Sequence, residues 1–380
     1  MADNKDKKVL NVPHLRFPEF SGEWECSTIG REFELYSGNT PSRLDKEQFN
    51  GNVNWISSGE LKEHYIYDTK EKITEEAASC NNLRLLPIGT FVIAIYGLEA
   101  EGVRGTGSVI QKKSTISQAC MAFSSKGTIT NEFLYSWYKK HGNLIGLKYA
   151  QGTKQQNLSY DIISQFRISY PSITEQKKLQ DFISLIDERI ATQNKIIEKL
   201  ESLIKGIAHR VAGMGKPNVC LKECLECTSS TLQESEVSDL GPYPVYGANG
   251  IVGFLDSYNT PDEAIYIVKD GSGVGSVAYV KGKCSATGTL NILTAKQDYS
   301  LQFLYYMLKV FNFEPYKTGM AIPHIYFKDY SKAKIFCSSY SKQLRYAKML
   351  EAIDAKLLIE QKVFISLNSQ KQYLLRLMFI

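Results

Sequence analysis

The chain has 380 residues, 43% of them hydrophobic, and a formal net charge of +5 at pH 7. At this length a single hydrophobic core is not expected, so we predict two domains and additional helices. The small charge excludes a wholly basic nucleic-acid-binding tail, so any surface for nucleic acid must be a local patch.

Hydropathy and cysteine usage predict a cytoplasmic protein. No apolar run reaches the roughly 18 residues that a membrane span needs, and the first eight residues, MADNKDKK, are polar. The eight cysteines lack the spacing of a disulfide framework, so we expect reduced thiols. Five of them fit ordinary core or strand positions: Cys26, Cys80, Cys120, Cys284 and Cys337.

The sequence of residues 1–25 predicts a polar tail followed by an extended arm that contains prolines. Within the arm, Leu15, Phe17, Phe20 and Trp24 are spaced apolar side chains. We expect these four to anchor the arm on the first domain.

Residues 26–171 predict a first globular, β-rich domain, because short β-type runs alternate with turn signals such as SGNTP. Residues 91–96 indicate a buried strand, and residues 131–142 a short helix rich in aromatic side chains. A polar, glycine-containing segment, GTKQQN, follows at 152–157.

A long helix is predicted at 172–212. Pro171 ends the preceding extended segment, Ser172 and Glu175 have the spacing of a capping box, and a glycine cluster from Gly213 stops the helix. Its apolar positions recur in steps of four and three, which is a coiled-coil seam with one polar member. The seam consists of Leu179, Ile183, Ile186, Ile190, Gln193, Ile197, Leu200, Ile204, Ile207 and Val211.

The second half of the chain repeats this design, with a globular domain at 213–338 and a long helix at 339–380. Adding 167 to the seam numbers gives a second, mostly apolar seam, in which polar Glu360 matches Gln193. We predict that these two side chains face each other at the centre of the helix pair. The second seam consists of Tyr346, Leu350, Ile353, Leu357, Glu360, Phe364, Leu367, Lys371, Leu374 and Met378.

No set of residues predicts catalysis or metal binding. Cys220, Cys224 and Cys227 have the spacing of a metal site but no fourth ligand nearby. The glycine-rich runs complete no phosphate-binding fingerprint, and the five histidines show no paired metal spacing. The Asp/Asn-Pro-Pro-aromatic motif of an amino-methyltransferase is absent from the sequence. We therefore expect no enzyme activity and no bound metal, against the alternative of a stand-alone DNA enzyme.

Two similar domains on one helix pair suit a protein that reads two half-sites of a long polymer, as dimeric DNA-binding proteins do. The alternative is a two-headed scaffold whose domains bind proteins. For DNA, the candidate contacts are polar and basic residues in loops: Arg43, Lys62, Arg104, Lys154 and Gln155 in the first domain, and Asn249, Lys269, Ser272, Lys283 and Lys317 in the second.

Four stretches of the first half form a distinctive combination: LRFPEFSGEW, WISSGEL at Trp55 to Leu61, GTKQQNLSYDII and the helix start PSITEQKKLQDFISLIDERI. Weaker copies, TGMAIPHIYFKDY and YSKQLRYAKMLEAIDAKL, stand in the second half. In these stretches the sequence resembles the DNA-specificity subunit of type I restriction–modification systems.

This resemblance implies an α+β fold in which two target-recognition domains are separated by two long antiparallel coiled-coil helices. Each domain would read one half of a bipartite double-stranded DNA target, and the helices would set the spacing. Two modification (methyltransferase) subunits would be partners, with nuclease and translocase subunits in the full complex. No cofactor is expected in this chain, because S-adenosylmethionine and ATP would be bound by those partners.

Overall fold

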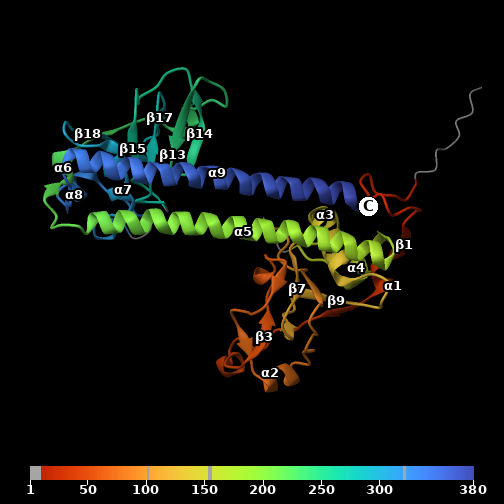
Figure 1. Cartoon of the computed structure of the whole chain (residues 1–380). Coiled ribbons are helices and arrows are strands. Elements are labelled where there is room, and N and C mark those ends of the chain that lie inside the picture. Colours follow the sequence, from red (N-terminus) through yellow and green to blue (C-terminus); the bar gives the residue numbers. More distant parts are fainter. Residues whose placement is uncertain (1–9, 101, 153–155, 272, 320–321) are drawn as a thin grey trace, which may run out of the picture. The chain divides into compact units, whose positions relative to one another are not determined.

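The computed structural model describes residues 10–380 apart from 101, 153–155, 272 and 320–321 (Figure 1). The chain divides into two compact units, residues 1–192 with 364–380, and residues 193–363. The two long helices, α5 (Ile173–Ala212) and α9 (Tyr340–Met378), each contribute residues to both units. No helix in the described part of the chain is long and apolar enough to cross a membrane.

The first unit is built on a five-stranded sheet with the order β2-β9-β6-β7-β4. Its strands are β2 (Phe33–Ser37), β9 (Cys120–Ser125), β6 (Phe91–Ala94), β7 (Gly107–Ile110) and β4 (Tyr65–Ile66). The central strand β6 is buried along its whole length, as its uninterrupted apolar run predicts. Helix α3 (Asn131–Tyr149) packs on β7, β6 and β9.

Smaller elements complete the first unit. A second sheet has the order β5-β3-β8, in which β3 (Val53–Ile56) runs parallel to β8 (Ser114–Ile116) and antiparallel to β5 (Lys72–Ile73). Strands β1 (Glu25–Thr28) and β10 (Arg167–Tyr170) form an antiparallel pair. The short helices are α1 (Ile29–Glu32), α2 (Glu75–Cys80) and α4 (Tyr160–Ser164).

The core of the first unit joins the sheet domain to the helix pair. Leu179 and Ile183 of α5 and Leu375 and Met378 of α9 are buried in the same cluster as the sheet strands and α3. The domain is therefore fastened to both helices by apolar packing, and burial of this kind is the main stabilising term in folding.

Helix α3 differs from the prediction, because it continues beyond Gly142 to Tyr149. The predicted helix ended at Gly142. In the structure Gly142 lies against the ring of Tyr138 and against Gly105, and Gly146 lies against the side chain of Arg104. These glycines permit close packing inside the helix, and that packing offsets their low helix propensity.

The N-terminal arm contacts helix α3 and the end of helix α9. Trp24 is 4% exposed and packs edge-on against Phe133, with ring centroids 5.8 Å apart. Leu15 was predicted to anchor through its side chain, and this was wrong, because the side chain is 41% exposed. Its backbone N–H instead donates to the carbonyl of Leu377 at 3.0 Å.

The start of α5 also differs from the prediction in one respect. Ser172 Oγ accepts from the N–H of Glu175 at 3.4 Å, as in a capping box, but the Glu175 side chain does not complete the box. Its carboxylate instead accepts two bonds from Arg16, at 2.8 and 2.7 Å. This bidentate pair supplies two charge-assisted bonds where the capping box would supply one, so the arm replaces half of the cap.

The second unit repeats the first with fewer elements. Its main sheet has the order β12-β18-β15-β16, and a smaller sheet has the order β14-β13-β17. The helix on the main sheet, α7 (Leu301–Lys309), is shorter than α3. The strands are β11 (Val219–Cys220), β12 (Leu225–Ser229), β13 (Tyr243–Gly247), β14 (Gly250–Leu255), β15 (Ala264–Val268), β16 (Val277–Val280), β17 (Ser285–Ala286), β18 (Leu290–Ala295) and β19 (Lys334–Ile335), and the short helices are α6 (Leu221–Cys224) and α8 (Phe327–Tyr330).

Corresponding contacts show that the two domains are copies. The pair β1 with β10 corresponds to β11 with β19, and both pairs are antiparallel. Leu158 N donates to the carbonyl of Ile95, and Ile325 N to that of Lys269, each at 2.9 Å. The fold is thus α+β with an internal repeat.

Candidate DNA interface and helix pair

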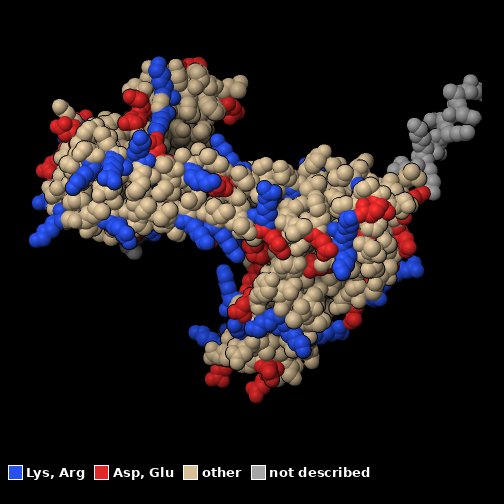
Figure 2. Space-filling view, in the orientation of Figure 1, with Lys and Arg blue, Asp and Glu red and all other residues tan. Residues whose placement is uncertain are grey.

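Three predicted DNA contacts, Lys154, Gln155 and Ser272, lie outside the described residues. The other seven lie in loops or at strand ends of the two sheet domains. Lys and Arg side chains form several groups on the visible face of each unit and are interspersed with acidic ones (Figure 2). The seven described candidates differ in what their side chains contact.

Arg43 and Lys317 are held by carboxylates of their own domains. Arg43 makes a two-pronged ion pair with Glu71, and its guanidinium lies 4.6 Å from the ring centroid of Phe49. Hydrogen bonding to the guanidinium holds the pKa of Glu71 below its usual range, so this pair is formed at neutral pH. Lys317 Nζ donates to Glu314 at 2.6 Å. A phosphate would have to compete with these partners.

The other five candidates are held less firmly by side chains of their own domains. Lys62 is exposed and makes no ion pair with any described residue, and Asn249 is exposed in the two-residue turn between β13 and β14. Lys283 Nζ lies 4.9 Å from the ring centroid of Tyr258, an exposed aromatic side chain. Arg104 and Lys269 are half-buried. Lys62, Asn249 and Lys283 are therefore the best placed to meet a DNA backbone or base edge.

In each domain a turn that contains a glycine precedes a buried residue at a matching position, Leu158 in the first domain and Ile325 in the second. Gly152 and Gly319 match at the offset of 167 and have φ values of 122° and 89°. At Gly319 a Cβ would lie 2.3 Å from the carbonyl oxygen of Ile322, so no other residue fits there without a shift. In the second domain His324 Nδ1 bonds Asp270 at 2.9 Å beside this turn.

Sequence reasoning missed a buried charge cluster around His64 in the first unit. The imidazole stacks on Tyr135 with centroids 3.9 Å apart and on Tyr65 at 4.0 Å. Its Nε2 lies 2.8 Å from Glu132 of α3, and its Nδ1 lies 3.3 Å from Asp187 of α5. Burial alone would lower the pKa of His64, but these two carboxylates outweigh it and raise the pKa.

The cluster extends to the second helix of the pair. Lys371 of α9 bonds the other oxygen of Asp187. Burial, together with the nearby charge of Lys371, lowers the pKa of Lys139 on α3 to about 8. The loop before β4, helix α3 and both long helices therefore meet at one group of charges.

The helix pair carries the predicted seam. In the second unit Gln193 Nε2 donates to the carbonyl of Glu360 at 3.0 Å and also to its carboxylate, so the predicted contact is present. Both side chains are buried, with exposed fractions of 8% and 9%. Met214 contacts Tyr346 in the same unit, so residue numbers rise along one helix and fall along the other, as in an antiparallel pair.

All the seam residues are buried or half-buried. Buried members include Leu179, Ile183, Ile197, Leu350, Leu357 and Leu367, and half-buried ones include Ile186, Ile190, Leu200, Ile353 and Phe364. Away from the seam, Leu185, Ile196 and Leu203 of α5 and Leu344, Met349, Leu358, Ile359 and Ile365 of α9 are exposed.

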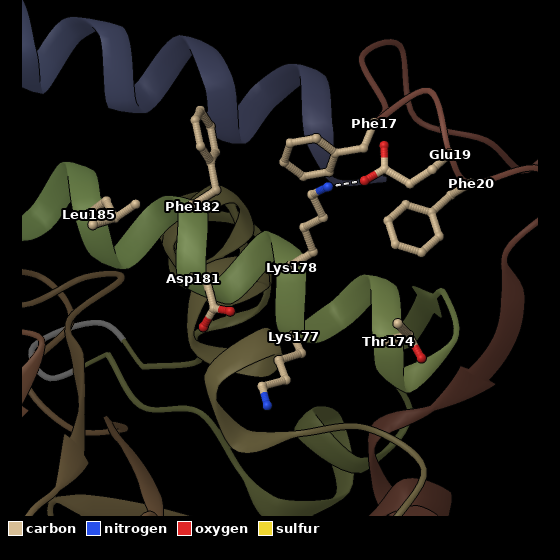
Figure 3. Close-up of a pocket in the computed structure, with 9 residues that line it drawn as sticks. All are labelled: Phe17, Glu19, Phe20, Thr174, Lys177, Lys178, Asp181, Phe182 and Leu185. Carbon is tan, nitrogen blue, oxygen red and sulfur yellow. Dashed lines mark hydrogen bonds and ion pairs between the residues drawn. The ribbon is translucent and has the colours of Figure 1, made fainter.

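An apolar groove of about 670 Å³ lies between the arm and the start of α5 (Figure 3). Phe17 and Phe20 come from the arm, and Phe182 and Leu185 from the helix. Phe17 and Phe182 pack edge to face at 5.8 Å, while Lys177 and Asp181 point away from them. The ion pair between Lys178 and Glu19 fixes the arm across the groove.

The cysteines lie in different environments. Cys120, Cys224, Cys284 and Cys337 are buried, but Cys26 and Cys80 are exposed. Cys80 is the last residue of helix α2, so its prediction as a core or strand residue was wrong. No group of three or more possible metal ligands occurs among the residues that the structure describes.

Comparison with known proteins gives one family. The family model described as "Type I restriction modification DNA specificity domain" matches residues 21–202 and again residues 216–368. The two matched segments correspond to the two copies described above.

Two individual relatives each share less than 30% of their residues with the matched part of this chain. The MjaIX specificity subunit of Methanocaldococcus jannaschii is 29% identical over 185 residues, which are 47% of this chain and 42% of that protein. The EcoR124I/EcoR124II specificity subunit of Escherichia coli is 27% identical over 202 residues, 52% of this chain and 48% of that protein. The matches thus span about half the length of these relatives.

Solved structures match over nearly the whole chain. The S subunit of a type I restriction–modification system from M. genitalium has a TM-score of 0.64 at 20% identity, over 97% of this chain and 99% of that one. A chain from a study of complex assembly in a type I system has a TM-score of 0.54 at 14% identity, over 93% and 96%. At these identities the likeness shows the fold.

Proposed function

Because the chain belongs to the type I restriction modification DNA specificity family, we propose that it recognises a bipartite DNA target, with each sheet domain reading one half. The observation that carries the proposal is the repeat: two domains of one design, each matched by the same family description, are joined to one helix pair. The DNA would lie against the exposed loops that carry Lys62 in one domain and Asn249 and Lys283 in the other.

The helix pair would set the distance between the half-sites and dock two modification subunits. Its support is the set of exposed apolar side chains on α5 and α9, since apolar positions outside the seam are available to pack against a partner. The groove beside Phe17 and Leu185 extends this surface onto the arm. Nuclease and translocase subunits would join the same complex.

The chain would contribute recognition and no chemistry. We assign S-adenosylmethionine to the modification subunits and ATP to the translocating subunits. Of this chain's charged groups, those around His64 pair with one another: His64 lies between Glu132 and Asp187, and Asp187 also pairs with Lys371. They hold elements of the first unit together.

The test is to express the chain with its modification subunit in cells lacking other methyltransferases and to sequence the methylated DNA positions. We expect one target made of two short half-sites with a fixed spacer, and no methylation with the chain alone. Methyl transfer by the purified chain, or a single continuous target, would contradict the proposal.

A further inference from the structure

The second domain lacks a strand that the first domain has. In the first, Val109 of β7 pairs with Phe91 of β6 on one side and with Tyr65 of β4 on the other. In the second, Tyr279 of β16 pairs with Ile265 of β15. Among the described residues, nothing pairs with β16 on its outer side, so it is the edge of its sheet.

The segment that covers the edge in the first domain also fills a groove between helices. Val109 N donates to the carbonyl of His64 at 2.7 Å, and Gln111 N to that of Ile66 at 2.8 Å. The same backbone places the His64 ring on Tyr135 and between the carboxylates of Glu132 and Asp187. One extended segment therefore supplies both a strand and a cationic ring.

The second domain keeps two of the three side chains that hold this ring, the tyrosine and the aspartate, and has glutamine in place of the glutamate. At the repeat offsets of 170 and 167, Tyr135, Glu132 and Asp187 correspond to Tyr305, Gln302 and Asp354. These three, with Tyr279, line an open groove of about 440 Å³ between α7 and α9. The groove is the unfilled counterpart of the His64 pocket.

Asp354 gives the groove its charge preference. It accepts a bond from Tyr306 Oη at 2.7 Å and makes no ion pair with the described residues. Lys371, which neutralises Asp187 in the first unit, corresponds to Ile204. Glu351 also lines the groove, paired at its rim with Lys281. Because Lys281 offsets the charge of Glu351, Asp354 is the carboxylate of this groove that has no cation among the described residues, and it favours a bound cation over DNA phosphate.

We propose that an extended segment of a partner protein binds in this groove, adding a strand parallel to β16 and placing a basic ring or ammonium group between Tyr305 and Asp354. The first domain provides the template for its chemistry, which is a basic residue followed by an aromatic and an aliphatic one, as in His64, Tyr65 and Ile66. Backbone bonds to the free edge would give affinity, and the ion pair would give specificity. This site does not depend on the proposed reading of DNA.

The probe is a fluorescent peptide with the sequence of residues 61–68, LKEHYIYD, titrated with the full chain. We expect saturable binding that Asp354→Asn weakens about ten- to a hundredfold, as loss of one charged hydrogen bond would. A peptide with glutamine in place of its histidine should lose the same factor, and combining both changes should cost no more than one alone. Asp256→Asn, an exposed carboxylate outside the groove, should leave binding unchanged.

Several results would overturn the proposal: absence of saturable binding, equal binding by Asp354→Asn, or displacement of the peptide by duplex DNA. Self-association of the chain that Asp354→Asn abolishes would assign the groove to a second copy instead. Unchanged thermal unfolding of Asp354→Asn would show that any loss of binding is not a loss of fold.

Discussion

His64 ties the first domain to the helix pair through a charge that depends on pH. Its pKa is raised in the folded chain, so its ion pairs are fully formed below the ordinary value of about 6.5 and are lost as the pH rises through the folded value. We predict that His64→Gln costs about 1.5 to 3 kcal/mol of stability at pH 6 and less at pH 8.5.

Thermal unfolding of the full chain at both pH values measures this effect, with the exposed His209→Gln as the matched control. An equal loss at both pH values would assign the effect to packing.

Nothing in the sequence marks His64, because a lone histidine has no spacing signal, and its partners Glu132 and Asp187 come from two other elements. Gln193 and Glu360, in contrast, were predictable, because each is the polar interruption of a periodic seam.

At the scale of elements, the seam makes a second prediction. Lys356 and Gln193 hold the pKa of Glu360 below its usual range, so the carboxylate is charged where the helices meet. Gln193→Leu alone should lower the unfolding temperature by a few degrees, because it removes a donor from a buried charge. Replacing Gln193 and Glu360 together by leucine should raise it above that of the unchanged chain, while weakening register.

Thermal unfolding of the three chains checks this order, and a double variant less stable than the unchanged chain would contradict it. The long helices were predictable within a residue or two, since heptad periodicity is a local signal repeated many times. The end of α3 and the small sheet of β3, β5 and β8 were not. They depend on contacts of Gly142 and on pairings such as Asn54 with Ser114, which are distant in sequence.

At the scale of the whole molecule, the repeat makes modularity testable. Each domain has its own sheets and is fastened to the helix pair within its own unit, as by His64 in the first and by Tyr306 with Asp354 in the second. The sequence predicted this organisation, because an offset of 167 relates entire seams. It could not predict that the copies differ at the sheet edge, since β4 is only two residues long and has no periodicity of its own.

If each domain reads one half-site, exchanging residues 26–170 for the matching segment of a relative should change one half of the methylated sequence and leave the other half and the spacer length unchanged. The exchange leaves α5 and α9 intact, so whatever the helix pair sets should persist. The exchange removes His64 and Glu132 and keeps Asp187 and Lys371. The segment taken from the relative must therefore supply a cation that faces Asp187. Sequencing methylated DNA from cells with the exchanged chain gives the answer, and a change in both halves would mean that the domains do not read independently.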